Sequence, residues 1–167
     1  DWMEAHFYNY ITVAAMLILY GVLFLVVENR RTTPRVTKLE QISYRDALLI
    51  GVWQCLAIIP GTSRSGATIL GAILIGCARP IAAEFSFFLA IPTMFGASAL
   101  KLVKFLANNS FSGAEVAILL VGMLVSFLVS VVAIRGLMSY VKKRDFSFFG
   151  YYRIVLGLLV ILAIVLA

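Results

Sequence analysis

A polar stretch at residues 60–68 interrupts a strongly apolar sequence and reads Pro-Gly-Thr-Ser-Arg-Ser-Gly-Ala-Thr. A guanidinium placed in hydrocarbon costs from roughly 3 to more than 10 kcal/mol, so the sequence predicts a function for Arg64. Gly61 and Gly66 lack a Cβ, which allows a tight turn and the close approach of a ligand. A chain with this stretch has to fold so that the charge is kept away from lipid tails.

The residues around Arg64 indicate an anion site. Ser63, Ser65 and Thr68 supply hydroxyl groups, and the first amides of a following helix direct partial positive charge at the loop. Together with a guanidinium fork these groups suit phosphate best. The plainer alternative is a Pro-Gly turn from which Arg64 extends to a lipid headgroup.

The composition places the chain in a bilayer. Its mean hydropathy is +1.01, with 62% hydrophobic and 13% charged residues, which is outside the soluble globular class. The net charge of +6 does not indicate nucleic-acid binding, because the basic residues lie beside apolar segments, as the positive-inside rule describes. Cys55 and Cys77 lie in apolar sequence and are interpreted as packing residues. The acidic, aromatic start lacks a signal-peptide pattern and favours a chain cut from a longer protein.

We predict an all-α integral membrane protein with one membrane domain over residues 1–167. Four apolar segments are long enough to span a bilayer, namely 10–27, 81–106, 115–137 and 151–167. Residues 28–46 form a polar cytoplasmic loop, in which Ser43 is expected to cap the next helix. Residues 141–149 are expected to form a second basic loop, and His6 is expected at the membrane interface.

Residues 47–77 are predicted to form a re-entrant helix-loop-helix hairpin. The apolar pieces 47–59 and 67–77 are each too short to cross a bilayer, so they form either a hairpin or one broken span. In a hairpin, the lysines and arginines other than Arg64 all lie on one side of the membrane, except Lys101 and Lys104, which lie on the other. In a broken span, these basic residues are divided almost evenly between the two sides. The positive-inside rule therefore favours a hairpin that enters from the cytoplasmic side.

Two further features concern helix contacts. Glu84 lies early in the 81–106 span, where its carboxylate is expected to pair with Arg64 in the protein interior or with Arg79 at the interface. Gly122 and two serines four and eight residues later, Ser126 and Ser130, form a small-residue face suited to helix packing.

The sequence resembles the undecaprenyl-pyrophosphate phosphatase family of the bacitracin-resistance type. The resemblance is carried by Gln54-Cys55-Leu56-Ala57, by the Pro-Gly-Thr-Ser-Arg-Ser-Gly-Ala-Thr stretch and by Ala83-Glu84-Phe85-Ser86-Phe87. The family also has an earlier motif with paired glutamates and a Ser-Ser-Thr-Gly-His run, which this sequence does not contain. The chain therefore resembles the C-terminal part of such a protein.

The resemblance implies half of an inverted-repeat bundle in the bacterial cytoplasmic (inner) membrane, with its active site open to the periplasmic side. It implies hydrolysis of undecaprenyl diphosphate to undecaprenyl phosphate, the lipid carrier for cell-wall (peptidoglycan) synthesis, with Mg²⁺ or Ca²⁺ assisting. The family's glutamates and histidine belong to the upstream half, which becomes an expected partner. A homodimer is left open, and no metal ligand is assigned on this chain.

Carried over by motif, the catalytic residues are Ser63, Arg64, Ser65 and Thr68, and the substrate-binding residues are Gly61, Gly66, Gln54 and Glu84. The resemblance assigns Arg64 to clamping the diphosphate and stabilising the transition state. Ser63 is either the nucleophile or a hydroxyl ligand of the phosphate.

The polar loop supplies no general base. Arg64 stays protonated and cannot act as one, so we expect no phosphatase activity from this chain alone. The alternative function is a lipid flippase or anion transporter, since re-entrant loops with half-helix N-termini aimed at an anion also occur in transporters.

Overall fold

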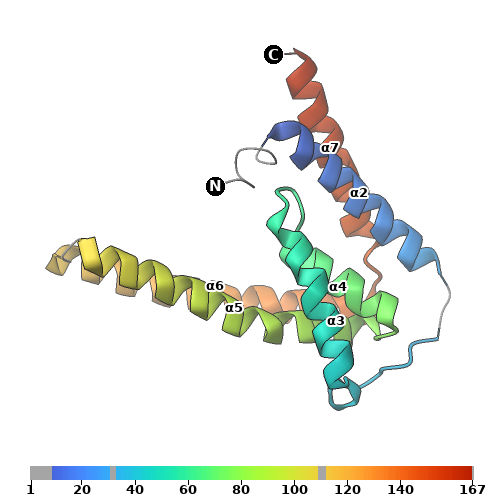
Figure 1. The fold of residues 1–167 in the computed structure, drawn as a ribbon, viewed down its shortest axis with the longest axis horizontal. Coiled ribbons are helices and arrows are strands. Elements are labelled where there is room, and N and C mark those ends of the chain that lie inside the picture. Colours follow the sequence, from blue (N-terminus) through green and yellow to red (C-terminus); the bar gives the residue numbers. More distant parts are fainter. Residues whose placement is uncertain (1–8, 31–32, 109–111, 167) are drawn as a thin grey trace.

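The computed structural model describes residues 9–30, 33–108 and 112–166 and is all-helical within them (Figure 1). The helices are α2 (Tyr10–Asn29), α3 (Tyr44–Cys55), α4 (Arg64–Ile75), α5 (Arg79–Asn108), α6 (Gly113–Lys143) and α7 (Ser147–Leu166), with 3₁₀ turns η1 (Leu39–Gln41) and η2 (Leu56–Ile58). The helices α2, α5, α6 and α7 are long and apolar enough to cross a membrane. The predicted all-α class with four long apolar helices is therefore confirmed, whereas His6 lies outside the described residues.

Side-chain caps explain where several helices begin. Ser43 accepts a hydrogen bond from the Asp46 amide and Asp46 reaches back to the Ser43 amide, so the predicted cap of α3 is confirmed. Ser63 caps α4 in a similar way by accepting from the amide of Gly66. The end of α4 is set by Gly76, whose φ of 104° is the left-handed conformation that glycine adopts easily.

The basic loop predicted over residues 141–149 is wrong. Helix α6 continues to Lys143 and α7 begins at Ser147, so only residues 144–146 connect them. Lys142 and Lys143 occupy the last turn of α6, where positive charge interacts favourably with the helix dipole. The basic residues thus extend the helix instead of forming a loop.

Helices α2 and α7 lie side by side because glycines let their backbones approach (Figure 1). A Cβ built on Gly21 would lie 2.6 Å from the Cγ1 of Ile154, and one on Gly157 would lie 2.7 Å from the Cγ1 of Ile18. Small residues at membrane helix contacts permit this close packing. The pair forms one wall, and α4 packs against its α2 side.

Helices α3 and α4 form a hairpin joined by η2 and the polar loop. Gly71 in α4 leaves room for Trp53 of α3, because a Cβ at residue 71 would lie 2.4 Å from the indole Cγ. Both open ends of the hairpin lie together with the preceding loop, where Val36 forms a bridge with Cys77 and the Arg35 amide donates to Gly76 O at 2.8 Å. The polar loop is therefore the closed tip of the hairpin.

A charged cluster joins the ends of three long helices. The side chain of Glu28, at the end of α2, is only 4% exposed; it pairs with Arg79 at the start of α5 and accepts the Phe146 amide at 3.1 Å. The alternative in which Glu84 pairs with Arg79 is wrong. Five positions along a helix place two side chains on different faces, so Arg79 instead meets a carboxylate from another helix.

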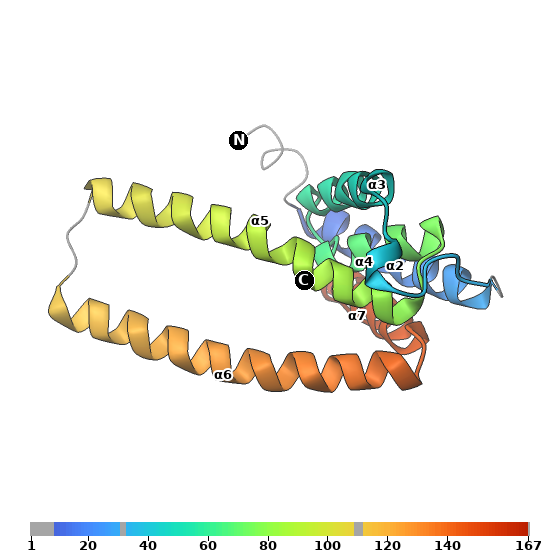
Figure 2. The same ribbon diagram turned by 90° about the horizontal axis from the view of Figure 1, so that it is seen from below.

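Residues 91–108 of α5 and 113–130 of α6 extend away from the other helices as an antiparallel pair, which we call the arm (Figure 2). The described side chains of residues 112–130 are all exposed, as are those of 91–98. No atom of the described chain lies within 4 Å of a Cβ built on Gly122, and Ser126 and Ser130 are exposed. The packing predicted for this small-residue face is not made within the described structure.

Candidate functional site

The polar loop, at the closed tip of the hairpin, lies against the wall formed by α2 and α7. Gly61 has a φ of 87°, and a Cβ there would lie 2.6 Å from the carbonyl oxygen of Val13. Both the backbone conformation and the close contact require glycine. Val13 is the fourth residue of α2, whose 20 residues are about 30 Å long, so the loop lies toward the end of α2 opposite the Glu28–Arg79 cluster.

The start of α4 directs hydrogen-bond donors at the loop. The Oγ of Ser63 accepts from the Gly66 amide at 3.1 Å and lies 3.2 Å from the Oγ of Ser65, so these hydroxyls are adjacent. The amides of Arg64 and Ser65 belong to the first turn and have no partner within a helix. Two hydroxyls and two amides can therefore bind one anion.

Arg64 is the first residue of α4 and is partly exposed. No hydrogen bond or ion pair to its guanidinium is formed by any residue that the structure describes. The predicted alternative pairing with Glu84 is therefore absent from this part of the chain. The structure leaves the Arg64 fork available for a ligand at the hairpin tip.

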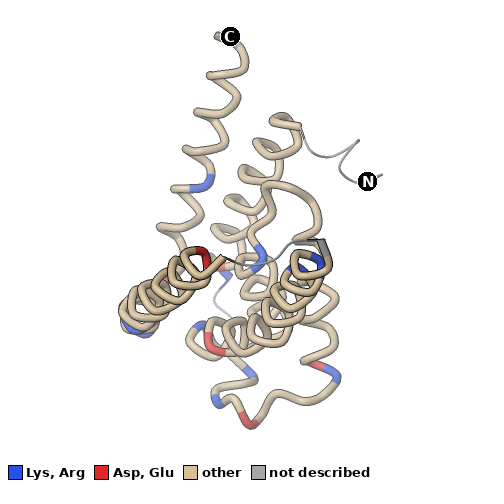
Figure 3. Tube along the Cα trace, turned by 90° about the vertical axis from the view of Figure 1, so that its left-hand side faces the viewer, with Lys and Arg blue, Asp and Glu red and all other residues tan. Residues whose placement is uncertain are grey.

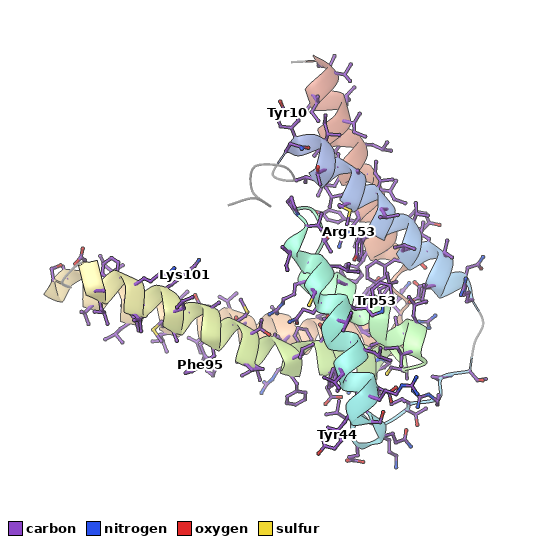
Figure 4. The ribbon with its side chains drawn as sticks, viewed as in Figure 1. Tyr10, Tyr44, Trp53, Phe95, Lys101 and Arg153 are labelled. Atoms are coloured by element: carbon purple, nitrogen blue, oxygen red, sulfur yellow. The ribbon has the colours of Figure 1, made fainter. Side chains whose placement is uncertain are left out.

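A second arginine, Arg153 of α7, lies beneath the loop and was not identified as a site residue from the sequence (Figure 4). It is 9% exposed, and its Nη2 donates to the carbonyl oxygen of Gly61 at 2.8 Å. The guanidinium lies over the Tyr20 ring, 5.6 Å from its centroid, an arrangement with a favourable cation–π attraction. Its buried Nε has no hydrogen-bond partner among the described residues.

The structure also explains Gly66, which leaves space for Arg153. A Cβ on Gly66 would lie 3.0 Å from the Nη1 of Arg153 and 3.1 Å from the Cβ of Ser63. The sequence contained one signal for Arg153, since it is the only charged residue in the segment 151–167. The positive-inside count treats Arg153 only as a basic residue on the cytoplasmic side, although a charge inside a span usually has a functional or structural partner.

Thr68 faces away from the loop. It is buried, its hydroxyl lies 2.5 Å from that of Ser86 on α5, and it also bonds to the Ser65 carbonyl at 3.0 Å. This position suits a residue that fixes α4 against α5. The structure does not bring its hydroxyl together with those of Ser63 and Ser65, and a catalytic role for Thr68 stays a prediction.

No hydrogen bond or ion pair in the described chain joins two other predicted residues, Gln54 and Glu84, to the loop. The Nε2 of Gln54 donates to the hydroxyl of Thr93 on α5 at 3.4 Å. Glu84 is half-buried, with no hydrogen bond or ion pair in the described chain. Their predicted substrate-binding roles remain untested.

The donors around the loop do not by themselves fit a divalent metal. Mg²⁺ and Ca²⁺ prefer carboxylate oxygens, whereas hydroxyls and guanidinium groups surround this loop. Within the described ranges, no group of three or more His, Cys, Asp or Glu side chains gathers. The described residues around the loop would therefore not hold a divalent metal by themselves.

The open end of the hairpin is held by a buried carboxylate. The side chain of Asp46 is 7% exposed, bonds to the Ser43 hydroxyl at 2.7 Å and forms an ion pair with Arg35 at 2.7 Å. The hydrogen bonds from Ser43, reinforced by Arg35, lower the pKa of Asp46 below its ordinary value. Nearby, burial raises the pKa of the Cys77 thiol. The end of the hairpin far from the loop is thus fixed by polar contacts.

Comparison with known proteins gives a consistent result. The family model described as "Bacitracin resistance protein BacA" matches residues 1–159. The undecaprenyl-diphosphatase of Acetivibrio thermocellus is 62% identical over 164 residues, which is 97% of this chain and 60% of that protein. The undecaprenyl-diphosphatases of Lactiplantibacillus plantarum and Enterococcus faecalis are 60% and 55% identical, with 96% of this chain and 60% and 59% of those proteins covered.

The chain thus spans about 60% of the length of the curated relatives that it matches. The match agrees with the resemblance carried by the loop motif, which is confirmed. This chain belongs to the bacitracin resistance protein BacA family.

Proposed function

We propose that this chain forms part of a membrane phosphatase that hydrolyses undecaprenyl diphosphate to undecaprenyl phosphate and inorganic phosphate. Relatives at 55–62% identity are named undecaprenyl-diphosphatase. The observation that carries the proposal is the unpaired Arg64 fork beside two hydroxyls at the start of α4. Such a constellation grips the oxygens of a diphosphate and the charge that develops on them.

Each loop residue has a proposed role. Arg64 clamps the diphosphate through two parallel hydrogen bonds, which a lysine cannot reproduce. The Oγ of Ser63 already accepts from the Gly66 amide, so its proton remains to donate to a phosphate oxygen or to Ser65. This arrangement favours Ser63 as a hydroxyl ligand over Ser63 as the nucleophile, because no described base lies within hydrogen-bond distance of it.

Arg153 is proposed to be a positioning residue. Its hydrogen bond to the Gly61 carbonyl joins α7 to the loop, and its charge lies below the same loop. Fixing the loop lowers the entropy that the site would otherwise lose on binding substrate. The charge of Arg153 also adds to the positive potential that attracts a diphosphate.

The proposed orientation follows from where the loop and the basic residues lie. The hairpin tip contacts the fourth residue of α2, whereas the end of α4 lies beside the Glu28–Arg79 cluster. A re-entrant hairpin rooted on the cytoplasmic side, with its site open to the periplasmic side of the inner membrane, agrees with this arrangement. The lipid tail would stay in the bilayer while the diphosphate reaches the loop.

The general base and any Mg²⁺ or Ca²⁺ ligands are proposed to come from the part of the longer protein that this chain does not include. Co-expression tests this division. Residues 1–167 alone are expected to release no phosphate, and activity is expected when the upstream half of the same protein is added. Robust hydrolysis by residues 1–167 alone would overturn the division and make Ser63 and Glu84 the first candidates for the chemistry.

The decisive assay uses the full-length protein purified in detergent with undecaprenyl diphosphate. A phosphatase releases inorganic phosphate, and the Arg64→Gln variant releases far less at equal protein concentration. A flippase or anion transporter moves lipid or anion across vesicles but releases no phosphate. Transport without phosphate release would therefore replace the proposed function with the alternative.

A further inference from the structure

A cavity of about 680 Å³ lies at the opposite end of the molecule from the loop, where α2 ends, α5 begins and α6 ends. Its lining includes five basic residues and two acidic ones, which are Arg30, Arg79, Lys142, Lys143, Arg144, Glu28 and Asp145. Figure 3 shows charged residues gathered in the lower part of the chain, while the part of α7 nearest the C-terminus carries few. The cavity is therefore the basic end of a mostly uncharged bundle.

The acidic groups do not neutralise this cavity. Glu28 forms an ion pair with Arg79 and accepts a hydrogen bond from the Phe146 amide, so the charges of Glu28 and Arg79 cancel. Asp145 accepts from the Ser147 amide at 3.2 Å. The other four basic residues, Arg30, Lys142, Lys143 and Arg144, form no ion pair in the described ranges, and against Asp145 they leave a net charge of +3 on the lining.

The position and lining of the cavity indicate which class of anion it would bind. The cavity lies where three helices that are long and apolar enough to cross a membrane begin or end, namely α2, α5 and α6. Its walls also contain Val27, Ile73 and Val141, so apolar and cationic groups occur together. Under the positive-inside rule this surface faces the cytoplasm, where the leaflet carries anionic lipids that bind in basic pockets between helices.

We propose that this cavity binds the phosphate headgroup of an anionic glycerophospholipid of the cytoplasmic leaflet, separately from the diphosphate site at the hairpin tip. The headgroup would lie among Arg30, Lys142, Lys143 and Arg144, with its tails along the exposed apolar side chains of the neighbouring helices. Because the cavity joins three helix ends, a bound lipid would stabilise the arrangement of α2, α5 and α6.

The test compares two triple variants of the full-length protein. Lys142→Gln/Lys143→Gln/Arg144→Gln removes three basic residues of the cavity, whereas the control Lys38→Gln/Arg45→Gln/Arg135→Gln removes three basic residues that do not line it. Each protein is purified from vesicles of phosphatidylcholine with phosphatidylglycerol, and the retained phosphatidylglycerol is counted by native mass spectrometry. Thermal unfolding in phosphatidylcholine alone checks that each variant is folded.

The wild type and the control are expected to retain phosphatidylglycerol, and the cavity variant is expected to bind it on the order of a hundredfold more weakly, at about fivefold for each charge removed. Equal loss in both triple variants would overturn the proposal in favour of bulk surface potential. Displacement of the lipid by inorganic phosphate would instead identify a site for the free anion. If the cavity variant does not fold, Lys143→Gln alone is used, and undiminished binding by it would contradict the proposal.

Discussion

The packed part of the chain and the arm both contain helices that are long and apolar enough to span a membrane, yet they differ in how protein contacts position them. In the packed part, comprising α2, α3, α4 and α7, glycines such as Gly21 and Gly71 lie directly under side chains of a neighbouring helix. In the arm, Gly96 and Gly122 have no neighbouring atom of the described chain within 4 Å of a Cβ built on them. Packing inside this chain therefore positions the candidate site, whereas the arm depends on its surroundings.

This difference teaches that hydropathy alone does not identify the functional region. In a bilayer, lipid tails cover apolar helices as well as protein does, so exposed leucines in α6 cost little. A buried arginine needs protein contacts, and Arg153 obtains them from Gly61 and Tyr20. The distribution of close contacts and buried charge therefore separates the site from the spans.

The largest expected difference between the two regions is in turnover, when a charge is removed from the loop or from the arm. We expect Arg64→Gln in the full-length protein to lower turnover by about 10²–10³-fold, because a group that stabilises transition-state charge is lost. Arg64→Lys keeps the charge but loses the fork, and should lower turnover by at least about tenfold. Phosphate release measures both effects.

The control for Arg64 is Lys101→Gln, which removes an exposed charge from the arm and should leave turnover within about twofold, as usual for a surface substitution. Normal turnover in Arg64→Lys would mean that Arg64 supplies only positive potential. A large effect of Lys101→Gln would break the contrast by placing part of the arm near the chemistry.

The next effect concerns the link between α7 and the loop. Arg153→Lys should lower kcat about tenfold or more, since one hydrogen bond to a charged group contributes roughly 1.5–3 kcal/mol. Arg135→Lys is the matched change on the exposed surface of α6 and should have no effect. Added guanidinium should partly restore the kcat of Arg153→Ala, an outcome that a purely structural loss would not give. If guanidinium does not restore kcat and the melting temperature of Arg153→Ala is lowered, the positioning role is contradicted.

Two glycine substitutions test the packing difference directly. Gly71→Ala should destabilise the protein by about 1–3 kcal/mol because the new Cβ displaces Trp53. Gly122→Ala should instead stabilise α6 by about 0.5–1 kcal/mol, since it meets no described atom and improves helix propensity. Thermal unfolding in detergent compares them. Destabilisation by Gly122→Ala would show that the small-residue face is packed in the full-length protein.

The smallest effect is expected at the open end of the hairpin. The lowered pKa of Asp46 means that its stabilisation is complete above the unfolded-state pKa, near 4, and is lost as the pH falls through the folded-state pKa. Asp46→Asn should therefore cost about 1 kcal/mol at neutral pH and nothing in strong acid. The free energy of unfolding measured across that pH range checks the prediction, with Glu40→Gln as an exposed control. An equal difference in this free energy between wild type and Asp46→Asn at all pH values would contradict it.

Much of the architecture is determined by local sequence. Apolar segments of spanning length predict the four long helices. The free energy of inserting such a segment into a bilayer is a sum over consecutive residues, so it does not require knowledge of neighbours in space. Ser43 predicts the start of α3, since a cap acts over three residues. The loop motif likewise identifies Arg64 and the family, because its residue types lie next to one another in the chain.

The partners of the charged and small side chains are decided only by the tertiary structure. Arg153 meets Gly61 from 92 positions away, and Arg79 meets Glu28 from 51 positions away instead of Glu84 nearby. Thr68 belongs to the loop motif but faces Ser86 in the α4–α5 contact. These pairings depend on how each helix is rotated about its axis and on where it packs. Successive residues of a helix differ by about 100° in direction, so a small change in helix rotation or register brings a different side chain to a given contact.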